Sequence, residues 1–203
     1  MLKVGVLVSG TGTNLQALLD QVHGRDAEIV AVISNDASAG ALARAGAADV
    51  DTAVFTLADH DDDRVVRDAA MAEWLVQHDV GLVVLAGYMQ LLTAGFLAAF
   101  PQAVINVHPA LLPAFPGVRA VEQALEYGVK VFGVTVHFVD EGVDTGPVIL
   151  QRAIELPGVS DADEVRAALR PLEHELLPEA VRLFARGALS LDPDNPRKVV
   201  VAQ

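Results

Sequence analysis

The chain of 203 residues contains no cysteine, which excludes disulfide bridges, thiolate metal ligands and a cysteine nucleophile. Long hydrophobic runs are also missing, because no apolar stretch reaches the roughly 18 residues that a membrane-spanning helix needs. We therefore expect no membrane partner. The first residues lead directly into a strand-like pattern, Leu2–Val8, which speaks against a signal peptide and favours a cytoplasmic protein.

Basic residues are scarce: 14 Lys and Arg stand against 27 Asp and Glu, for a formal charge of −13. The basic residues are scattered, and only Arg197 and Lys198 are adjacent. A chain this acidic repels a phosphate backbone, so we expect no nucleic-acid partner. If a substrate carries a phosphate, backbone amides must hold it. The acidic run at 59–63 favours a solvated loop and helix start over a metal site.

The first half of the chain alternates between β-branched apolar runs and helical segments rich in Ala and Leu. Strands are expected at 2–8, 28–34, 54–55, 81–86 and 103–107, and helices at 14–22, 39–47, 63–78 and 93–100. This alternation predicts a doubly wound α/β fold with a mostly parallel sheet. The segment 81–86 is apolar on both faces, which is typical of a central strand.

The second half has a different pattern. A helix is expected at 119–127, followed by strands at 130–140 and 148–156 that no helix separates, so an antiparallel edge is predicted. A helical stretch at 161–186 contains Pro171 and Pro178, which should kink or divide it. The tail at 192–203 shows no core-facing pattern. We expect a single domain with one half over about 1–100, which binds a phosphate or nucleotide, and another over about 101–190.

The loop Ser9–Leu15 joins the first strand to the first helix and contains Gly10 and Gly12. Ligands of open α/β sheets bind at the carboxyl ends of strands, and a helix start with glycines can hold a phosphate through its amides. The third glycine of a dinucleotide fingerprint is missing, and no Gly-Lys-Ser/Thr sequence is present. A site for one phosphate monoester remains, and the alternative is a helix cap that binds nothing.

Asn106 and His108 lie at the end of an apolar run, just before Pro109. Residues two apart on a strand point the same way, so the amide and the imidazole should face one space. A carboxylate from a distant loop, Asp144, can fix the tautomer or protonation of the imidazole, and we expect it to raise the pKa of His108. A donor amide for an oxyanion beside a proton-transfer group is suited to acyl or formyl transfer. No Gly-x-Ser-x-Gly turn supplies a nucleophile.

The other histidines have simpler interpretations. Four of them fall at helix ends or in acidic runs and are expected to be solvated: His23, His60, His78 and His174. His137 points to the same strand face as Thr135 and can approach the site, although a structural role is favoured. A metal triad of His108, His137 and Asp144 lacks a close ligand pair, so we expect no metal.

Six motifs occur in order along the chain. They are Val8–Leu15, Val32–Asn35, Leu85–Met89, Ile105–Pro113, Gly133–Val139 and Asp144–Pro147. In these motifs the chain, from Val4 to about Leu189, resembles the folate-dependent phosphoribosylglycinamide formyltransferases of purine biosynthesis. The resemblance implies a Rossmann-like formyltransferase fold, 10-formyltetrahydrofolate as co-substrate and glycinamide ribonucleotide as substrate. It leaves open whether the protein is a monomer or a homodimer.

The resemblance also implies roles for individual residues. The catalytic residues would be Asn106, His108 and Asp144. The substrate phosphate would bind at Gly12, Thr13 and Asn14, and the rest of the substrate at Glu173 within Arg170, Pro171, Leu172 and Glu173. The folate would bind at Arg64, Met89, Gln90, Leu91, Leu92, Asn106, Asp140, Glu141, Gly142, Val143 and Asp144. Gln90 departs from the family, since many relatives carry Arg there.

Formyl transfer to the ribonucleotide is therefore the leading hypothesis for the function. A hydrolase that releases formate from the same folate would use the same Asn106, His108 and Asp144, but would need no phosphate loop. A methionyl-tRNA formyltransferase is disfavoured by the acidic charge and by a chain too short for an added tRNA-binding domain. A non-catalytic nucleotide-binding module would leave the three site residues without a purpose.

Overall fold

The computed structural model describes residues 1–202. The chain divides into two compact units, residues 1–105 and residues 106–202. Each unit is built around its own part of the sheet, and each holds a different part of the expected site.

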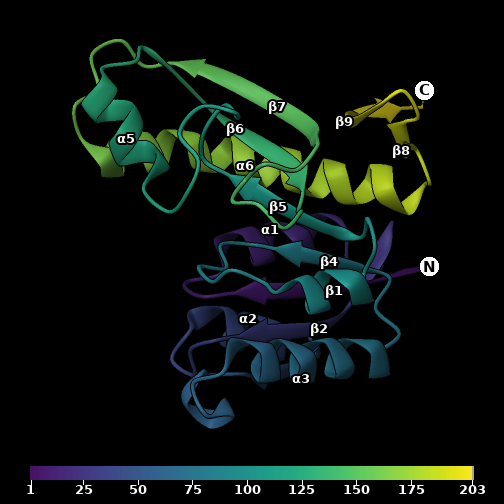
Figure 1. Cartoon of the computed structure of the whole chain (residues 1–203). Helices are drawn as coiled ribbons and strands as arrows, with labels where there is room; N and C mark the ends of the chain where they lie inside the picture. The colour runs from purple at the N-terminus through teal and green to yellow at the C-terminus, as the bar shows by residue number, and fades with distance from the viewer. Residues whose placement is uncertain (203) are drawn as a thin grey trace. The chain divides into compact units, whose positions relative to one another are not determined.

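The first unit contains a parallel sheet. Its strands are β1 (Leu2–Val8), β2 (Ala27–Ser34), β3 (Asp51–Val54) and β4 (Leu82–Leu85). β1 pairs with β2 and β4, and β2 pairs with β3, all in parallel (Figure 1). The amide of Val83 donates to the carbonyl of Ala103, so the chain that enters β5 (Val104–His108) lies beside β4. The parallel sheet is confirmed, although the third strand lies at 51–54 rather than at 54–55.

Helices connect the strands of this unit. They are α1 (Thr13–Gln21), α2 (Gly40–Ala47), α3 (Arg64–Gln77) and α4 (Ala94–Ala99), with a short 3₁₀ helix, η1 (Ala58–His60), before α3. α1 packs against α2, and α3 packs against α4. The Asp63 carboxylate accepts hydrogen bonds from the amides of Val65 and Val66. The acidic run therefore ends as a helix cap, as predicted.

The second unit contains an antiparallel pair, β6 (Val131–Phe138) and β7 (Val148–Glu155). A helix, α5 (Ala120–Tyr127), precedes them and ends at Gly128, whose φ of 83° is the left-handed conformation that glycine favours. These elements confirm the antiparallel edge. Together with the parallel strands they confirm the expected α/β fold class with a mostly parallel sheet.

The sequence predicted that Pro171 and Pro178 would kink or divide the long helical stretch. The prolines do not divide it, because α6 (Ala162–Ala185) is a single helix of 24 residues. A proline in a helix removes one hydrogen bond and clashes with the preceding turn. α6 packs against β6, β7 and α5, and its second half is largely buried. Tertiary packing of this face outweighs the local cost of the prolines.

The tail contains a β-hairpin that the sequence did not lead us to expect. β8 (Leu189–Asp192) and β9 (Asn195–Val201) pair antiparallel, and Lys198 of β9 pairs with Val148 of β7. Pro196 falls where the register between β8 and β9 shifts, so its missing amide donor breaks no regular ladder bond.

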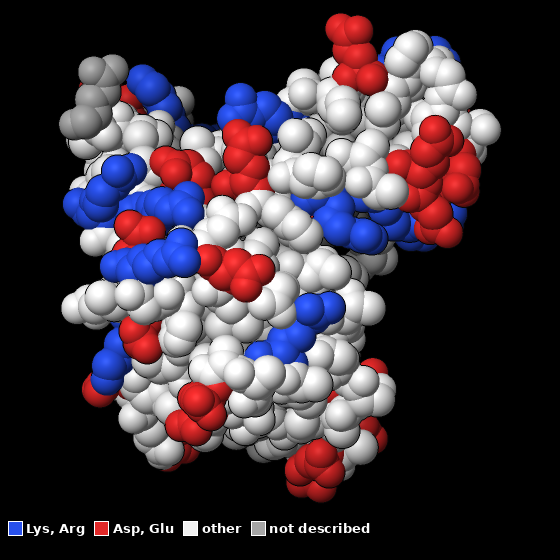
Figure 2. Space-filling view, turned by 180° about the vertical axis from the view of Figure 1, so that it is seen from behind, with Lys and Arg blue, Asp and Glu red and all other residues white. Residues whose placement is uncertain are grey.

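No helix of residues 1–202 is long and apolar enough to span a membrane. On the face displayed in Figure 2, Lys and Arg side chains are interspersed with Asp and Glu, and the described residues form no continuous basic surface there. This distribution agrees with the scattered basic residues of the sequence.

Candidate active site

The glycine loop of the first unit is shaped by the helix packed behind it. Gly12 has a φ of 77°, and a Cβ on it would lie 2.6 Å from the Cβ of Ala41, so only glycine fits. The guanidinium of Arg44 donates from Nε to the carbonyl of Thr11 at 2.8 Å. These contacts fix the loop just before α1, where Thr13 and Asn14 form the first turn.

The segments after three parallel strands are joined by hydrogen bonds to the Ser9 side chain. The hydroxyl of Ser9, after β1, donates to Oδ1 of Asn35, after β2, at 2.5 Å. The same hydroxyl accepts the amide of Met89, after β4, at 2.9 Å. The glycine loop and the segment Met89–Leu92 thus meet at the edge of the sheet where ligands of such folds bind.

The segment Met89–Leu92 is attached to α3. The side-chain carbonyl of Gln90 accepts a hydrogen bond from Nη1 of the buried Arg67. The side chains of Met89 and Leu91 are 61% and 54% exposed. Arg64, also expected at the folate site, is exposed in the first turn of α3.

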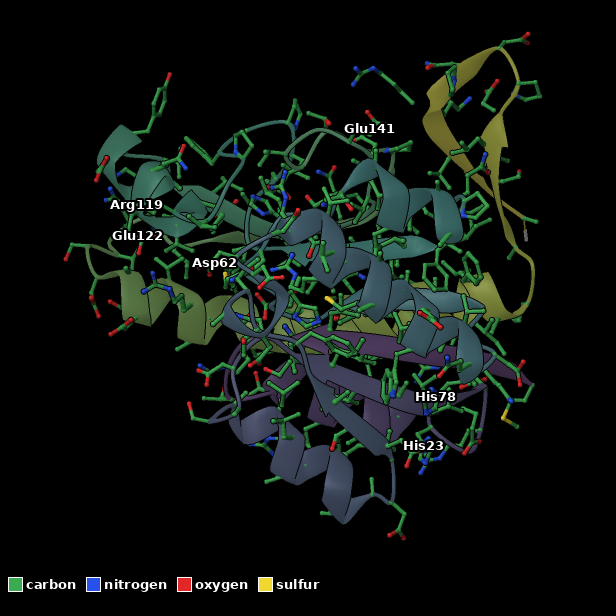
Figure 3. The ribbon with its side chains drawn as sticks, turned by 60° about the horizontal axis from the view of Figure 1, so that its bottom comes forward. His23, Asp62, His78, Arg119, Glu122 and Glu141 are labelled. Atoms are coloured by element: carbon green, nitrogen blue, oxygen red, sulfur yellow. The ribbon has the colours of Figure 1, made fainter. Side chains whose placement is uncertain are left out.

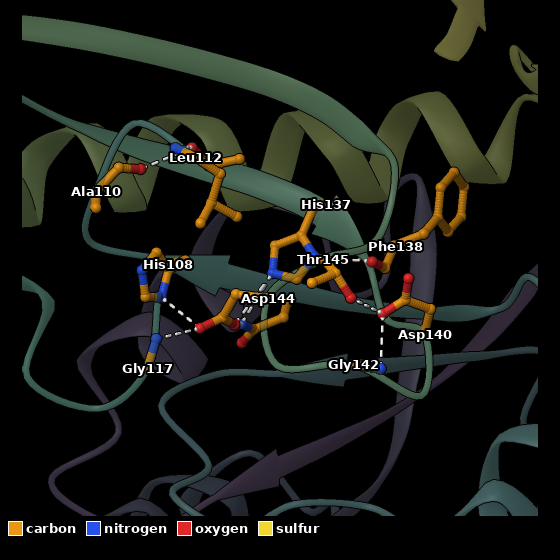
Figure 4. Close-up of polar contacts among 12 residues, drawn as sticks. His108, Ala110, Leu112, Gly117, His137, Phe138, Asp140, Gly142, Asp144 and Thr145 are labelled. Atoms are coloured by element: carbon orange, nitrogen blue, oxygen red, sulfur yellow. Dashed lines mark hydrogen bonds and ion pairs between the residues drawn. The ribbon is translucent and has the colours of Figure 1, made fainter. Parts of the chain in front are cut away.

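The second unit brings together the three residues expected to be catalytic, and Figure 4 shows two of them, His108 and Asp144, side by side. Asn106 and His108 lie two apart on β5, and each contacts one carboxyl oxygen of Asp144. The Nδ1 atom of His108 lies 3.4 Å from Oδ2, and the amide nitrogen of Asn106 lies 3.4 Å from Oδ1. The convergence expected of an amide, an imidazole and a carboxylate is found.

Hydrogen bonds to the main chain fix the tautomer of His108. Its Nε2 lies 2.8 Å from the carbonyl of Phe115, which can only accept, so Nε2 carries the proton in the neutral ring. The Nδ1 atom is then the basic nitrogen, and it faces Asp144. The carboxylate is itself held by the amide of Gly117, which donates to Oδ2 at 2.7 Å.

The pKa of His108 does not follow the expectation. Burial of the imidazole lowers its pKa below the ordinary 6.5, and this effect outweighs the Phe115 carbonyl and the Asp144 carboxylate, which both raise it. Asp144 thus acts in the expected direction, but the net shift is opposite to the prediction because the ring is 4% exposed. The neutral imidazole is therefore favoured at neutral pH.

The pKa of Asp144 is lowered to about 2. Burial alone would raise the pKa of this carboxyl. The side chain of His137, the Gly117 amide and the imidazole of His108 each favour the anion, and together they outweigh burial. Asp144 is therefore an anion over the physiological pH range. Its carboxylate can accept a hydrogen bond from Nδ1 of His108 when that nitrogen carries a proton.

His137 belongs to the site, although a structural role was favoured from the sequence. Its Nε2 lies 3.2 Å from the amide nitrogen of Asn106 and 3.5 Å from Oδ1 of Asp144. Its Nδ1 lies 2.7 Å from the carbonyl of Phe138 and therefore carries a proton. In the neutral ring Nε2 accepts a hydrogen bond from the side-chain amide of Asn106. This bond orients the amide so that its two hydrogens face His137 and Asp144. The shared strand face with Thr135 was the only sequence signal for this placement.

The loop that carries Asp144 is closed on itself. Oδ1 of Asp140 accepts the amide of Gly142 at 3.1 Å and the hydroxyl of Thr145 at 2.6 Å (Figure 4). A Cβ on Gly146 would overlap the carbonyl of Phe138, so the loop closes tightly against the end of β6. Asp144 itself has a φ of 53°, a conformation that a non-glycine residue adopts only when its surroundings enforce it.

The four residues Arg170–Glu173 lie within α6, with the first two exposed and the last two half-buried. The contacts of the first-unit loops and of the second-unit cluster are each internal to their unit. The roles expected for these residues toward ligands stay predictions.

The remaining histidines are not simply solvated, which corrects the expectation. All four are half-buried. His78 is held by the carbonyl of Trp74 at 2.7 Å, and His23 accepts the amide of Ile29 at 3.1 Å. Figure 3 shows His23 and His78 near one another in the first unit. Within residues 1–202, no group of three or more His, Asp or Glu is placed to hold a metal ion.

The cluster on β5 combines an amide donor, a neutral imidazole with one basic nitrogen and a carboxylate anion. It contains no side-chain nucleophile. Such a site is suited to direct transfer of an acyl or formyl group from one bound molecule to another, with the protein moving protons and stabilising charge.

Comparison with known proteins agrees with this class. Residues 2–181 match the family described as formyl transferase. Phosphoribosylglycinamide formyltransferase of Haemophilus influenzae is 40% identical over 193 residues, which cover 94% of this chain and 91% of that protein. The structure of glycinamide ribonucleotide transformylase 1 from Symbiobacterium toebii superposes with a TM-score of 0.95 at 46% identity, covering 100% of this chain and 95% of that one.

The chain belongs to the phosphoribosylglycinamide formyltransferases. A more distant similarity is to a formyltetrahydrofolate deformylase from Pseudomonas syringae, with a TM-score of 0.90 at 26% identity. This chain spans 66% of the length of that protein.

Proposed function

We propose that this protein transfers the formyl group of 10-formyltetrahydrofolate to the amine of 5'-phosphoribosylglycinamide, a step of purine biosynthesis. The observation that carries the proposal is the contact of Asn106 and His108 with the two oxygens of one carboxylate, Asp144. Membership of the family supports the choice of substrates.

The ribonucleotide phosphate is assigned to the glycine loop. A phosphate monoester there would accept hydrogen bonds from the amides of Gly12, Thr13 and Asn14 at the start of α1. The nearby guanidinium of Arg44 supports the loop and adds a positive charge in a strongly acidic protein. This arrangement needs no basic patch.

The transfer itself needs no covalent enzyme intermediate. The substrate amine attacks the formyl carbon, a new C–N bond forms, and the formyl oxygen gains negative charge. His108 takes the amine proton at Nδ1, the nitrogen left basic by the bond from Nε2 to Phe115. The imidazolium then donates to Asp144 until the proton passes to the departing N10 of the folate, as the old C–N bond breaks.

Asn106 is proposed to stabilise the charge on the formyl oxygen. Its two amide hydrogens face His137 and Asp144, at 3.2 and 3.4 Å. The longer contact, to Asp144, is the weaker one, so that hydrogen is the one available to a formyl oxygen. Donors of this kind are commonly worth about 3–4 kcal/mol in the transition state.

The folate is assigned to two segments and one side chain. One segment is Met89–Leu92, whose exposed apolar side chains offer a surface to aromatic rings. The other is the closed loop Asp140–Asp144, and the side chain is that of Arg64. Glu173 on α6 is assigned to the glycinamide part of the substrate.

The test is incubation of the protein with 10-formyltetrahydrofolate, with and without glycinamide ribonucleotide, while the folate absorbance is followed. Formation of tetrahydrofolate that depends on the ribonucleotide, with one formylated product for each folate consumed, is the expected result. Folate turnover at the same rate without the ribonucleotide would contradict the proposal.

Hydrolysis of the same folate is the second candidate, because the chain shares its fold with a formyltetrahydrofolate deformylase. Water would replace the amine as nucleophile, with the same His108 and Asp144. The tightly shaped glycine loop favours the transferase, since a hydrolase has no phosphorylated second substrate to hold.

A further inference from the structure

The first unit contains a buried charge pair that the proposed chemistry does not use. Arg67 and Asp68, adjacent on α3, are both fully buried. Arg67 donates to Oδ1 of Asp68 from Nε at 2.9 Å and from Nη2 at 2.6 Å. A buried pair costs desolvation free energy and is weak evidence of a stabilising role by itself. Its other contacts show what it holds.

The further hydrogen bonds found for these two side chains go to one segment, residues 90–93. Nη1 of Arg67 donates to the side-chain carbonyl of Gln90, and Nη2 lies 3.5 Å from the carbonyl of Leu91. Oδ2 of Asp68 accepts the amide of Thr93 at 2.7 Å. Both charged side chains are thereby hydrogen-bonded to the segment that follows β4.

These contacts place a polar side chain of the segment inward and leave two apolar side chains in solvent. The polar side chain of Gln90 faces a buried guanidinium, while its apolar neighbours Met89 and Leu91 are exposed. A surface loop left to hydration alone would place its side chains the other way. The pair therefore holds two apolar side chains in solvent at the ligand edge of the sheet.

We propose that Arg67, Asp68 and Gln90 form a positioning anchor that presents Met89 and Leu91 to the folate, and that Gln90 sets folate affinity from inside the protein. This inference rests on the proposed function, since it assigns the presented surface to a folate. The same contacts favour glutamine at position 90. A cation there would meet the Arg67 guanidinium, whereas glutamine supplies the acceptor that Arg67 needs.

The test compares Gln90→Leu with Gln90→Glu. Leucine keeps the size of the side chain but cannot accept from Arg67, while glutamate restores an acceptor. The Kd for tetrahydrofolate, measured by calorimetry, should rise about 10-fold in Gln90→Leu, the effect of one lost charge-assisted hydrogen bond, and return to within about 3-fold of wild type in Gln90→Glu. The KM for folate should rise by about the same factor as this Kd, and the KM for the ribonucleotide should rise much less.

Gln77→Leu makes the same substitution at an exposed position and is the control. Gln77 lies at the end of α3, the helix that contains Arg67 and Asp68. A general loss of native structure would lower the Tm and kcat and raise both KM values together, and that result would overturn the anchor. Equal folate Kd values for Gln90→Leu and Gln77→Leu would also overturn it. If the wild-type protein binds tetrahydrofolate but shows no ribonucleotide-dependent transfer, the proposed function is refuted. The folate Kd values of the variants would still test the anchor in that case. Absence of folate binding by wild type would refute both.

Discussion

Nδ1 of His108 lies 3.4 Å from Oδ2 of Asp144, and the opposite ring nitrogen donates to a main-chain carbonyl. The contact is therefore a full hydrogen bond only when the ring carries a second proton. Asp144 stays charged, with a pKa of about 2, while burial lowers the pKa of His108. The pair is thus arranged to receive a proton during the reaction and to release it again.

Replacement of Asp144 by asparagine should lower the pKa of His108 further, because burial would no longer be opposed by a charge. An NMR titration of the His108 ring measures this pKa directly. Asp194→Asn, at an exposed position in the tail hairpin, is the control and should leave it unchanged. An unshifted pKa in Asp144→Asn would refute the coupling.

Replacement of His108 by alanine should reduce kcat by about 10²- to 10⁴-fold, the usual contribution of a positioned acid or base. The Kd for tetrahydrofolate should remain near the wild-type value, because the folate is assigned to other segments. His23→Ala, far from β5 in sequence and in the other unit, serves as control. Wild-type turnover in His108→Ala would remove the residue from the mechanism.

Replacement of His137 by phenylalanine should lower kcat about 10-fold, because the Asn106 amide loses the acceptor that orients it. His137→Gln offers a side-chain carbonyl in place of Nε2 and should lose less. Steady-state kinetics at saturating substrates distinguish the two variants. If both lose activity equally along with Tm, His137 is only a structural residue.

Most of the fold could be predicted from periodicity. The buried strands and amphipathic helices of the first unit have strong patterns, and the missing helix between β6 and β7 dictated their antiparallel pairing. The hairpin of β8 and β9 was missed because its residues are mostly exposed and interrupted by Pro193 and Pro196. The long helix α6 was expected to be kinked or divided, since proline costs are local whereas its packing is tertiary.

The part of the site that consists of side chains could be predicted from the sequence. Asn106 and His108 share a strand face, and the family motif supplied Asp144. Main-chain partners such as the Phe115 carbonyl and the Gly117 amide leave no pattern in the sequence. The net pKa of His108 was also out of reach, because it depends on the extent of burial rather than on the identity of its neighbours.

Replacement of Thr13 by aspartate should raise the KM for the ribonucleotide at least about 5-fold, because like charges about 4 Å apart cost between about 1 and 4 kcal/mol. The KM for folate should change much less. Thr13→Asn is the neutral control of the same size. Equal increases of both KM values in Thr13→Asp would show that the glycine loop does not hold the phosphate.

Acid should reduce the free energy of unfolding in two stages. His108 has a lowered pKa when folded, so its contribution is present above about pH 6.5 and is lost as the pH falls toward the folded pKa. Asp144 has an ordinary pKa of 3.8 and a folded pKa of about 2, so its contribution is present above about pH 4 and is lost as the pH falls through about 2. That second contribution amounts to at most about 2–3 kcal/mol.

In Asp144→Asn the second stage is absent, and the first stage moves to lower pH together with the pKa of His108. The exposed acids whose pKa values are also lowered, such as Asp36 and Asp79, titrate in both proteins and cancel in the difference. Urea unfolding of wild type and variant should therefore show a stability difference that shrinks as the pH falls from about 4 to about 2. A difference that stays constant down to pH 2 would mean that Asp144 gains no net stabilisation as an anion. The hydrogen bonds from Gly117 and His137 would then do no more than offset its burial.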